Sequence, residues 1–273
     1  MTCPGSLPSP RDIQRWSPTS RNQIVGNTDI LNTLANFSEQ GPANLLVTGP
    51  SRSGKTRTIK LAIRALCCPF RLGPLDPCGQ CQTCRDIGDV RGSHVGLFAG
   101  AAQSTFGYIA IDAETVSKND LLALANDVEA NNSNTLIYID EVRAMESRGL
   151  VGTMLKVFDE SPATFLASAI TTKGPIWTGR RTKIQGIPEA MLARFLLKGT
   201  SLAAAPEVTR WMIDRSVEWH IPIVDPEITI PLVLRRTGHR VGYILHFFAT
   251  AASTRERRLT SDIAKNVNLT SPD

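Results

Sequence analysis

Short apolar runs recur along this chain and predict the strands of a sheet. The clearest are residues 44–48, 135–139 and 164–171. The run at 135–139 is hydrophobic, which is typical of a central parallel strand covered on both faces. We therefore expect an α/β protein built on a parallel sheet.

Two other patterns predict helices. Between residues 57 and 66, Ile59, Ala62, Ile63 and Leu66 recur at helical spacing and would form one buried face. A second helix is expected to end near Glu160, because Pro162 follows it.

The C-terminal quarter predicts a small helical unit, with helices over 208–219 and 241–252. Its large aromatic residues are Trp211, Trp219, Phe247 and Phe248. We expect these rings to form the core of that unit, and stacking on nucleic-acid bases is the alternative.

A phosphate-binding loop lies between the first predicted strand and the helix after it. The residues are Gly49-Pro50-Ser51-Arg52-Ser53-Gly54-Lys55-Thr56, a complete G-x-x-x-x-G-K-T motif (Walker A). Such a loop surrounds phosphates with backbone N–H groups, the lysine ammonium reaches the β and γ oxygens, and the threonine hydroxyl ligates Mg²⁺. A chance match in a Gly/Ser loop is the alternative, but the strand and helix in register favour binding of a nucleoside triphosphate.

Two carboxylates, Asp140 and Glu141, follow the predicted strand at 135–139. Ligands of open α/β sheets bind at the carboxyl ends of strands. Asp140 would hold the Mg²⁺ shell, and Glu141 would act as general base on the attacking water. An apolar strand followed by Asp-Glu is common by itself, and the phosphate loop upstream makes it informative.

The strand at 164–171 is expected beside the phosphate-loop strand, with a polar residue at its tip near the γ-phosphate or the water. Thr171 is the candidate for that position. An ordinary surface threonine is the alternative.

Five of the six cysteines fall within one short stretch: Cys67, Cys68, Cys78, Cys81 and Cys84. The C-x-x-C-x-x-C run from Cys78 to Cys84 brings three thiolates toward one tetrahedral ion, and Cys68 or Cys67 would supply the fourth. We expect a structural zinc, while an iron–sulfur cluster, disulfides and redox pairs remain alternatives.

The length of 273 residues fits one large or two modest domains. Hydrophobic residues are 42% and charged residues 20% of the chain, which is ordinary for a globular protein. No apolar run approaches the length of a membrane span, and the N-terminus lacks the apolar region of a secretory signal. We expect a cytoplasmic protein without a membrane partner.

The formal net charge is +5, and the basic residues are clustered. The clusters are Arg180, Arg181 and Lys183, and then Arg235, Arg236, Arg240, Arg255, Arg257 and Arg258. Such clusters suit a nucleic-acid backbone, and a solvated basic face explains them equally well.

Taken in order, these motifs resemble the AAA+ clamp-loader ATPases, in particular the gamma/tau subunits of bacterial DNA polymerase III. The resemblance covers roughly residues 15–270, and the cysteine insertion after the phosphate-loop helix is its most specific feature. The segment at 24–27 resembles the adenine side of the family's site, which implies that Val25 and Gly26 contact the base. Asp140-Glu141 matches Walker B, and residues 155–162 resemble the family's L-K-T-L-E-E-P-P segment.

Two arginines take roles only through this resemblance. Residues 187–194 resemble the segment that carries the arginine finger, which implies that Arg194 reaches the ATP of a neighbouring subunit. Residues 237–240 resemble the sensor-2 segment, which implies that Arg240 contacts the γ-phosphate. Surface positions are the alternatives for both.

The chain also departs from the family. Ala193 and Phe195 replace the residues that flank the finger, Ala169 and Ile170 occupy the sensor-1 position, and residues 172–186 resemble an insertion. The family's helical collar has no counterpart in this sequence.

The expected organisation is a loose arm over 1–14, an AAA+ core over 15–203 with the zinc knuckle at about 67–92, and a helical lid over 204–273. The expected function is Mg²⁺-dependent ATP hydrolysis in a clamp-loader-like assembly, with other AAA+ subunits, a sliding clamp or other replication protein, and DNA as partners. The alternatives are a nucleotide-binding adaptor with little turnover, and an AAA+ regulator of helicase loading or transposition.

Overall fold

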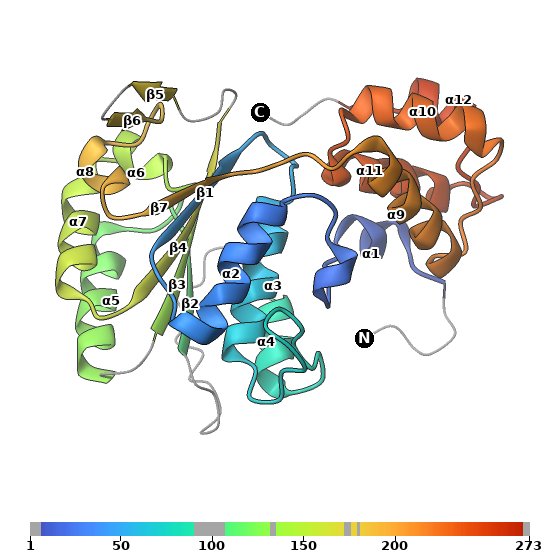
Figure 1. Cartoon of the computed structure of the whole chain (residues 1–273). Coiled ribbons are helices and arrows are strands. Elements are labelled where there is room, and N and C mark those ends of the chain that lie inside the picture. The colour runs from blue at the N-terminus through green and yellow to red at the C-terminus, as the bar shows by residue number, and fades with distance from the viewer. Residues whose placement is uncertain (1–6, 90–106, 132–134, 172–175, 179–180, 270–273) are drawn as a thin grey trace.

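The computed structural model describes residues 7–89, 107–131, 135–171, 176–178 and 181–269. A helix-covered sheet lies beside a separate group of helices (Figure 1). The expectations for residues 1–6, 90–92, 172–175, 179–180 and 270–273 lie outside the described residues, as do the side chains of Trp177, Arg181 and Lys183.

The sheet has five parallel strands in the order β2-β3-β4-β1-β7. The strands are β1 (Leu45–Gly49), β2 (Gly107–Asp112), β3 (Thr135–Asp140), β4 (Thr164–Ile170) and β7 (Leu196–Gly199). β4 pairs with β1, so that Leu166 lies opposite Leu45. The predicted parallel sheet, with β4 beside the phosphate-loop strand, is confirmed.

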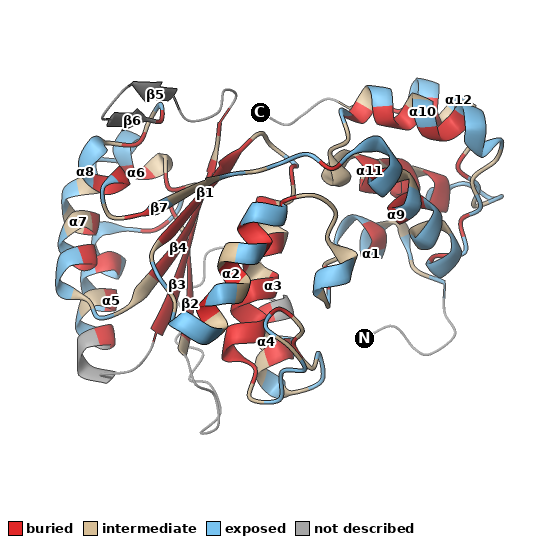
Figure 2. Ribbon diagram, in the orientation of Figure 1, coloured by how far each residue is buried: buried red, intermediate tan, exposed pale blue. Residues whose placement is uncertain are grey.

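Helices cover both faces of this sheet, because successive strand residues point to opposite sides. On one face lie α2 (Thr28–Gln40), α3 (Lys55–Cys67) and α4 (Gln82–Asp89). On the other lie α5 (Lys118–Asn131), α7 (Val151–Glu160) and α8 (Glu189–Leu192). The two cores divide β3 between them: Ile137 and Ile139 belong to one, Leu136 and Tyr138 to the other. The central strands β1, β3 and β4 are accordingly buried along most of their length, whereas the edge strand β7 is not (Figure 2).

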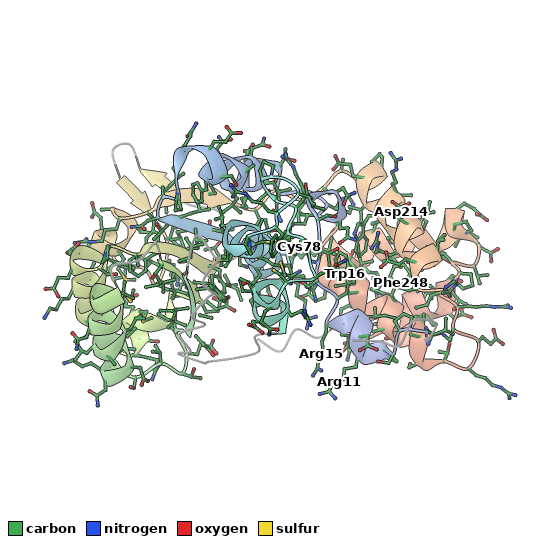
Figure 3. The ribbon with its side chains drawn as sticks, turned by 90° about the horizontal axis from the view of Figure 1, so that it is seen from below. Arg11, Arg15, Trp16, Cys78, Asp214 and Phe248 are labelled. Atoms are coloured by element: carbon green, nitrogen blue, oxygen red, sulfur yellow. The ribbon has the colours of Figure 1, made fainter. Side chains whose placement is uncertain are left out.

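The second group of helices has its own apolar core. It contains α9 (Ala205–Glu218), α10 (Pro226–Thr237), α11 (Val241–Ser253) and α12 (Ser261–Asn266). Trp211, Trp219, Phe247 and Phe248 are buried there, as the pattern predicted. Trp16 from the N-terminal segment packs edge-on against Trp211 and Trp219, and Trp219 packs edge-on against Phe248; Figure 3 labels Trp16 and Phe248. We call this group the lid; the predicted division at residues 203 and 204 falls in the connection from β7 to α9.

Residues 10–14 correct the expectation of a loose arm through residue 14. They form helix α1 (Pro10–Gln14), which packs on α11 and buries Ile13 in the lid core. A capping box explains its start: the Asp12 N–H donates to Ser9 Oγ, and the Ser9 N–H donates to Asp12 Oδ2. The N-terminal segment is therefore part of the lid.

The remaining elements are short. They are the 3₁₀ turn η1 (Arg21–Gln23), α6 (Ala144–Ser147), and the antiparallel pair β5 (Ile176–Thr178) and β6 (Arg181–Lys183). Across the described ranges, no helix combines the length and apolarity that a bilayer crossing requires.

Candidate functional site

The phosphate loop joins the C-terminal end of β1 to the first turn of α3, as its motif predicts. Gly54 lies at the start of α3 with φ +91°, a conformation that costs glycine little. Arg52 adopts φ +60° without being glycine. The Lys55 ammonium lies inside the loop and donates to the carbonyls of Gly49 and Pro50, at 3.0 and 2.9 Å.

The acid pair lies at the adjacent strand ends. Asp140 is the last residue of β3, and Glu141 follows with φ +51°. A Glu141 carboxylate oxygen accepts a hydrogen bond of 3.1 Å from the backbone N–H of Ile170, at the end of β4. β4 lies between β3 and β1, and all three strands are parallel. Both predicted motifs therefore lie at the same edge of the sheet, the one formed by the carboxyl ends of the strands.

A cavity of about 670 Å³ opens at this edge. Its lining includes residues of both motifs, together with residues of α1 and α11: Ser51, Arg52, Gly54, Lys55, Thr56, Asp140, Glu141, Gln14, Gly242, Leu245 and His246. A cavity of this volume is in the range of ligand sites. The predicted phosphate loop and acid pair thus line one cavity, and residues of the lid line it as well.

Burial shifts the pKa of each of the two central ionisable groups in the direction that disfavours its charged form. Burial lowers the pKa of Lys55, while the nearby Glu141 and Asp140 carboxylates raise it. Burial raises the pKa of Glu141 above the ordinary glutamate value, and the neighbouring Asp140 adds to the rise. A carboxyl with a raised pKa is better suited to accept a proton near neutral pH.

Two hydroxyls that the sequence analysis did not single out contact Asp140. Ser168 Oγ donates to Asp140 Oδ1 at 2.6 Å, and the Tyr138 hydroxyl donates to the same oxygen at 2.8 Å. Burial raises the pKa of Tyr138 well above its usual value, so the phenol stays protonated. The signal was present, since Tyr138 precedes Asp140 by two residues and so shares its face of the strand.

Three predicted site residues carry a buried polar atom that has no hydrogen-bond partner among the described residues. They are Ser53 Oγ, Thr171 Oγ1 and Arg240 Nε. Thr171 lies at the phosphate loop, since its backbone N–H donates to Gly49 O at 3.0 Å. Arg240 lies close enough to Lys55 to lower the pKa of that lysine. A phosphate group offers acceptors of the kind that these hydroxyl and guanidinium donors require.

The predicted adenine-side residues lie at the junction of core and lid. Val25 lines a small recess of about 30 Å³ between the N-terminal segment, the phosphate loop and α11. Val25 and Gly26 also line a wider cavity of about 770 Å³ toward α9. Asn27, whose role was not predicted, ties the parts together: its side chain donates to Ser53 O and accepts from the Ser201 N–H, both at 3.2 Å.

The lid touches the phosphate loop through the first turn of α11. The Gly242 N–H donates to Arg52 O at 3.2 Å, and the Arg52 guanidinium lies 5.1 Å from the centroid of the Tyr243 ring. A Cβ on Gly242 would lie 2.8 Å from Arg52 Cβ. Gly242 is therefore required for the close approach of lid and loop.

Gly242→Ala is expected to lower the free energy of unfolding by about 1–3 kcal/mol, the usual cost of overpacking. Chemical denaturation would measure this change. Gly152→Ala in α7 is the matched control, because its Cβ would meet nothing within 4 Å. The control should leave stability equal or higher, and equal effects of the two substitutions would contradict the contact.

Arg194 lies between α8 and β7, and it is absent from the lining of the 670 Å³ cavity. Its guanidinium makes a two-pronged ion pair with Asp159, with Nε–Oδ1 and Nη2–Oδ2 distances of 2.7 and 2.6 Å. These hydrogen bonds lower the pKa of Asp159. Arg194 is therefore not placed to contact a ligand in the cavity of its own chain.

The sulfurs of Cys68, Cys78, Cys81 and Cys84 all lie within 4.8 Å of one another. The Sγ–Sγ distance is 3.9 Å both from Cys68 to Cys81 and from Cys78 to Cys84. A tetrahedral ion with zinc–sulfur bonds of about 2.3 Å spaces its sulfurs about 3.8 Å apart. The four residues therefore fit one zinc ion, whereas a cluster of several irons would spread them further.

Cys67, the alternative fourth ligand, belongs instead to the core beneath the sheet. It is fully buried there, and burial raises the pKa of its thiol to about 12. The five described cysteines carry free thiols, so the structure does not support the disulfide alternative for them.

Two arginines of the C-terminal basic cluster serve the fold. Arg236 donates to the carbonyls of Ala264, Lys265 and Val267 and so ties α10 to α12. Arg257 donates to Pro8 O, at the start of the N-terminal segment. Arg235, Arg255 and Arg258 remain exposed.

Comparison with known proteins supports the fold. No family model matches the sequence. Protein STICHEL-like 1 of Arabidopsis thaliana is 29% identical over 75 residues, a stretch that spans 27% of this chain and 7% of that protein. The RuvB Holliday junction branch migration motor of Thermotoga maritima has a TM-score of 0.55 at 13% identity, over 93% of this chain and 71% of that chain. A single-residue variant of that RuvB gives 0.56 at 12%, over 91% and 70%.

These likenesses and the sheet topology show that the chain has an AAA+ P-loop α/β fold followed by helices. The four-cysteine cluster compatible with zinc lies between the first core helix after the phosphate loop and the next strand.

Proposed function

We propose that this chain is a Mg²⁺-dependent ATPase of the AAA+ class. One observation carries the proposal: the phosphate loop and the acid pair, 84 or more residues apart in sequence, line the same cavity. The AAA+ fold is consistent with it, because nucleotide sites of such sheets lie at the carboxyl ends of the strands.

The residues that line the cavity have separate proposed roles in binding the phosphates and Mg²⁺. The N–H groups of the loop and the positive end of α3 bind the phosphates, and the Lys55 ammonium neutralises the β and γ oxygens. Thr56 and Asp140 would hold Mg²⁺, which supplies positive charge against the negative charge that develops on the phosphates. Ser53, Thr171 and Arg240 each have a buried donor without a hydrogen-bond partner among the described residues, which supports binding of a phosphate-bearing ligand.

Glu141 is the proposed general base. It orients a water and accepts its proton as the water oxygen bonds to the γ-phosphorus. The bond from that phosphorus to the bridging oxygen breaks, and ADP leaves with the electron pair. The hydrogen bond from the Ile170 N–H holds the Glu141 carboxylate for this role.

Val25 and Gly26 are proposed to contact the adenine ring. Both residues line the wider cavity of about 770 Å³ toward α9, which is large enough for a purine. Because this cavity lies between core and lid, binding of the base would hold the two parts together.

Arg194 is proposed to act in trans, on the nucleotide of a neighbouring AAA+ subunit. Its position outside its own cavity and its partly exposed side chain support this role. Hydrolysis would then depend on assembly, since charge in the transition state is neutralised across an interface.

Arg194→Ala is expected to reduce assembly-dependent ATP turnover about 10³-fold, within the range measured for arginine fingers. Nucleotide affinity of the single chain should be unchanged. Asp159→Asn is the informative companion, because it removes the ion pair and leaves the arginine free. Steady-state assays as a function of protein concentration would measure the turnover of both variants. Equal losses of turnover would mean that Arg194 matters only through its surface ion pair with Asp159.

The finer proposal is that the chain belongs to a clamp-loader-like assembly, with a sliding clamp or other replication protein and DNA as partners. The motifs and the cysteine knuckle after α3 support it through their resemblance to gamma/tau subunits, and the exposed arginines of the lid suit a phosphate backbone. The proposed zinc is a structural ion, because its four protein ligands leave no open position.

Two other functions have specific support. An adaptor with little turnover is favoured by Ala169 and Ile170 at the end of β4, where a polar residue would assist hydrolysis. A DNA-associated regulator or motor outside clamp loading is favoured by the likeness to a Holliday junction branch migration motor.

Steady-state ATP hydrolysis with and without primer–template DNA separates these functions. Turnover that DNA stimulates supports the ATPase function. Turnover no higher than that of Glu141→Gln supports the adaptor function. Co-purification with a sliding clamp then separates the loader from a regulator, and the mass of the ATP-bound complex gives the number of subunits.

A further inference from the structure

Tyr138 is a buried phenol among the apolar residues of β3. It lies in β3, is 2% exposed, and packs in the core beneath α3. A buried tyrosine hydroxyl ordinarily needs a polar partner, because leaving it unpaired costs free energy. What this hydroxyl contacts is therefore informative.

The Tyr138 hydroxyl lies among the predicted metal-binding residues. It donates to Asp140 Oδ1 at 2.8 Å and lies 3.2 Å from Ser168 Oγ. Thr56 of the phosphate loop lies close enough for its hydroxyl to lower the pKa of the phenol. The phenol thus joins Asp140 of the acid pair to Ser168 of β4, beside the phosphate loop.

Ser168 completes a small network around the same carboxylate. Its hydroxyl donates to Asp140 Oδ1 at 2.6 Å, and the Glu141 N–H approaches Ser168 Oγ at 3.4 Å. Rotation of the Asp140 carboxylate would break two hydrogen bonds at once. The network therefore fixes the orientation of Asp140 before any cation binds.

The adjacent strand offers a contrast. Tyr108 in β2 is equally buried, at 2% exposure, and belongs to the same core. Its hydroxyl has no hydrogen-bond partner among the described residues. Burial in this core thus does not by itself pair a phenol, and the contacts of Tyr138 are specific to the site.

We propose that Tyr138 is a positioning residue for the divalent cation, holding the Asp140 carboxylate in the orientation that the ion requires. It acts through that ligand and does not touch the nucleotide. The inference rests on the proposed function, because it assigns a further residue to the same site. Partners of metal ligands typically tune metal affinity by 10- to 100-fold.

The test compares Tyr138→Phe with Tyr108→Phe, two substitutions that each remove one buried hydroxyl from the same core. A fluorescent ATP analogue is bound to wild type and both variants while Mg²⁺ is titrated, and again in excess EDTA. Tyr138→Phe should raise the Mg²⁺ concentration at half-maximal binding about tenfold. Its affinity in EDTA should equal that of wild type, and Tyr108→Phe should match wild type in both conditions.

Three results would overturn the inference. One is an unchanged Mg²⁺ dependence in Tyr138→Phe. Another is an equal loss of affinity with and without Mg²⁺, which indicates a packing defect, and the third is the same shift in Tyr108→Phe. A wild-type protein that binds no nucleotide removes the proposed function and the inference together, so the two failures are distinguishable.

Discussion

Glu141→Gln is expected to bind ATP with wild-type affinity and to hydrolyse it at least about 100-fold more slowly. The amide keeps the size of the side chain and its acceptor oxygen for the Ile170 N–H, but it cannot take a proton from water. Single-turnover hydrolysis beside equilibrium nucleotide binding would separate the two effects.

Glu160→Gln is the matched control, because Glu160 is an exposed carboxylate that pairs with Lys156 on the surface of α7. It should leave turnover unchanged. The pH profile gives a second check: since the pKa of Glu141 is raised, the wild-type rate should fall as pH drops through that raised pKa. Wild-type turnover in Glu141→Gln would contradict the assignment of the general base.

Cys81→Ser is expected to lose the bound zinc and to destabilise the protein by on the order of 5 kcal/mol, because binding of a structural zinc ion contributes directly to folding. The knuckle carries Leu75 and Ile87 into the core beneath the sheet, so its unfolding would expose that core. Metal analysis and chemical denaturation would measure both losses.

Cys67→Ala is the control for this experiment. Cys67 is a neighbouring cysteine buried in the same core, but it lies outside the group of four converging sulfurs. It should retain about one zinc per chain and lose only about 1 kcal/mol for the smaller side chain. Loss of metal in Cys67→Ala, or an iron absorption band in wild type, would contradict the Cys68-Cys78-Cys81-Cys84 zinc site.

The parts of the site that depend on local sequence were predictable. The strand, glycine loop and helix around residues 49–56 follow from short-range pattern, and so does the acid pair at the end of an apolar strand. Their convergence followed from the rule that parallel strands present their carboxyl ends at one edge. The choice between Cys67 and Cys68 was not predictable, because it depends on which side of α3's last turn faces the core.

Two helices depend on tertiary packing. α10 begins favourably with Pro226, but Pro231 in its interior and the β-branched Ile228 and Thr229 in its first turns disfavour a helix in isolation. Tertiary packing of Ile230, Val233 and Leu234 in the lid core overrides these preferences. For α1 the local signal existed in Ser9, Pro10 and Asp12, but a five-residue helix is stable only because Ile13 packs into the lid.

Most of the interactions that were missed join distant segments. Ser168 meets Asp140 because β3 and β4 are neighbours, and the Asn27 side chain reaches Ser53 O of the phosphate loop. Arg236 resembled part of a nucleic-acid surface in the sequence, yet it binds backbone carbonyls of α12 and the residue after it. Charge clustering alone does not distinguish these roles.

Calorimetric titration of the purified chain with ATP, in Mg²⁺ and then in EDTA, tests most directly whether residues 49–56 and the acid pair form one nucleotide site. We predict a single ATP per chain, bound more tightly with Mg²⁺ than without it. Absence of binding heat, or binding that is indifferent to the cation, would contradict the account.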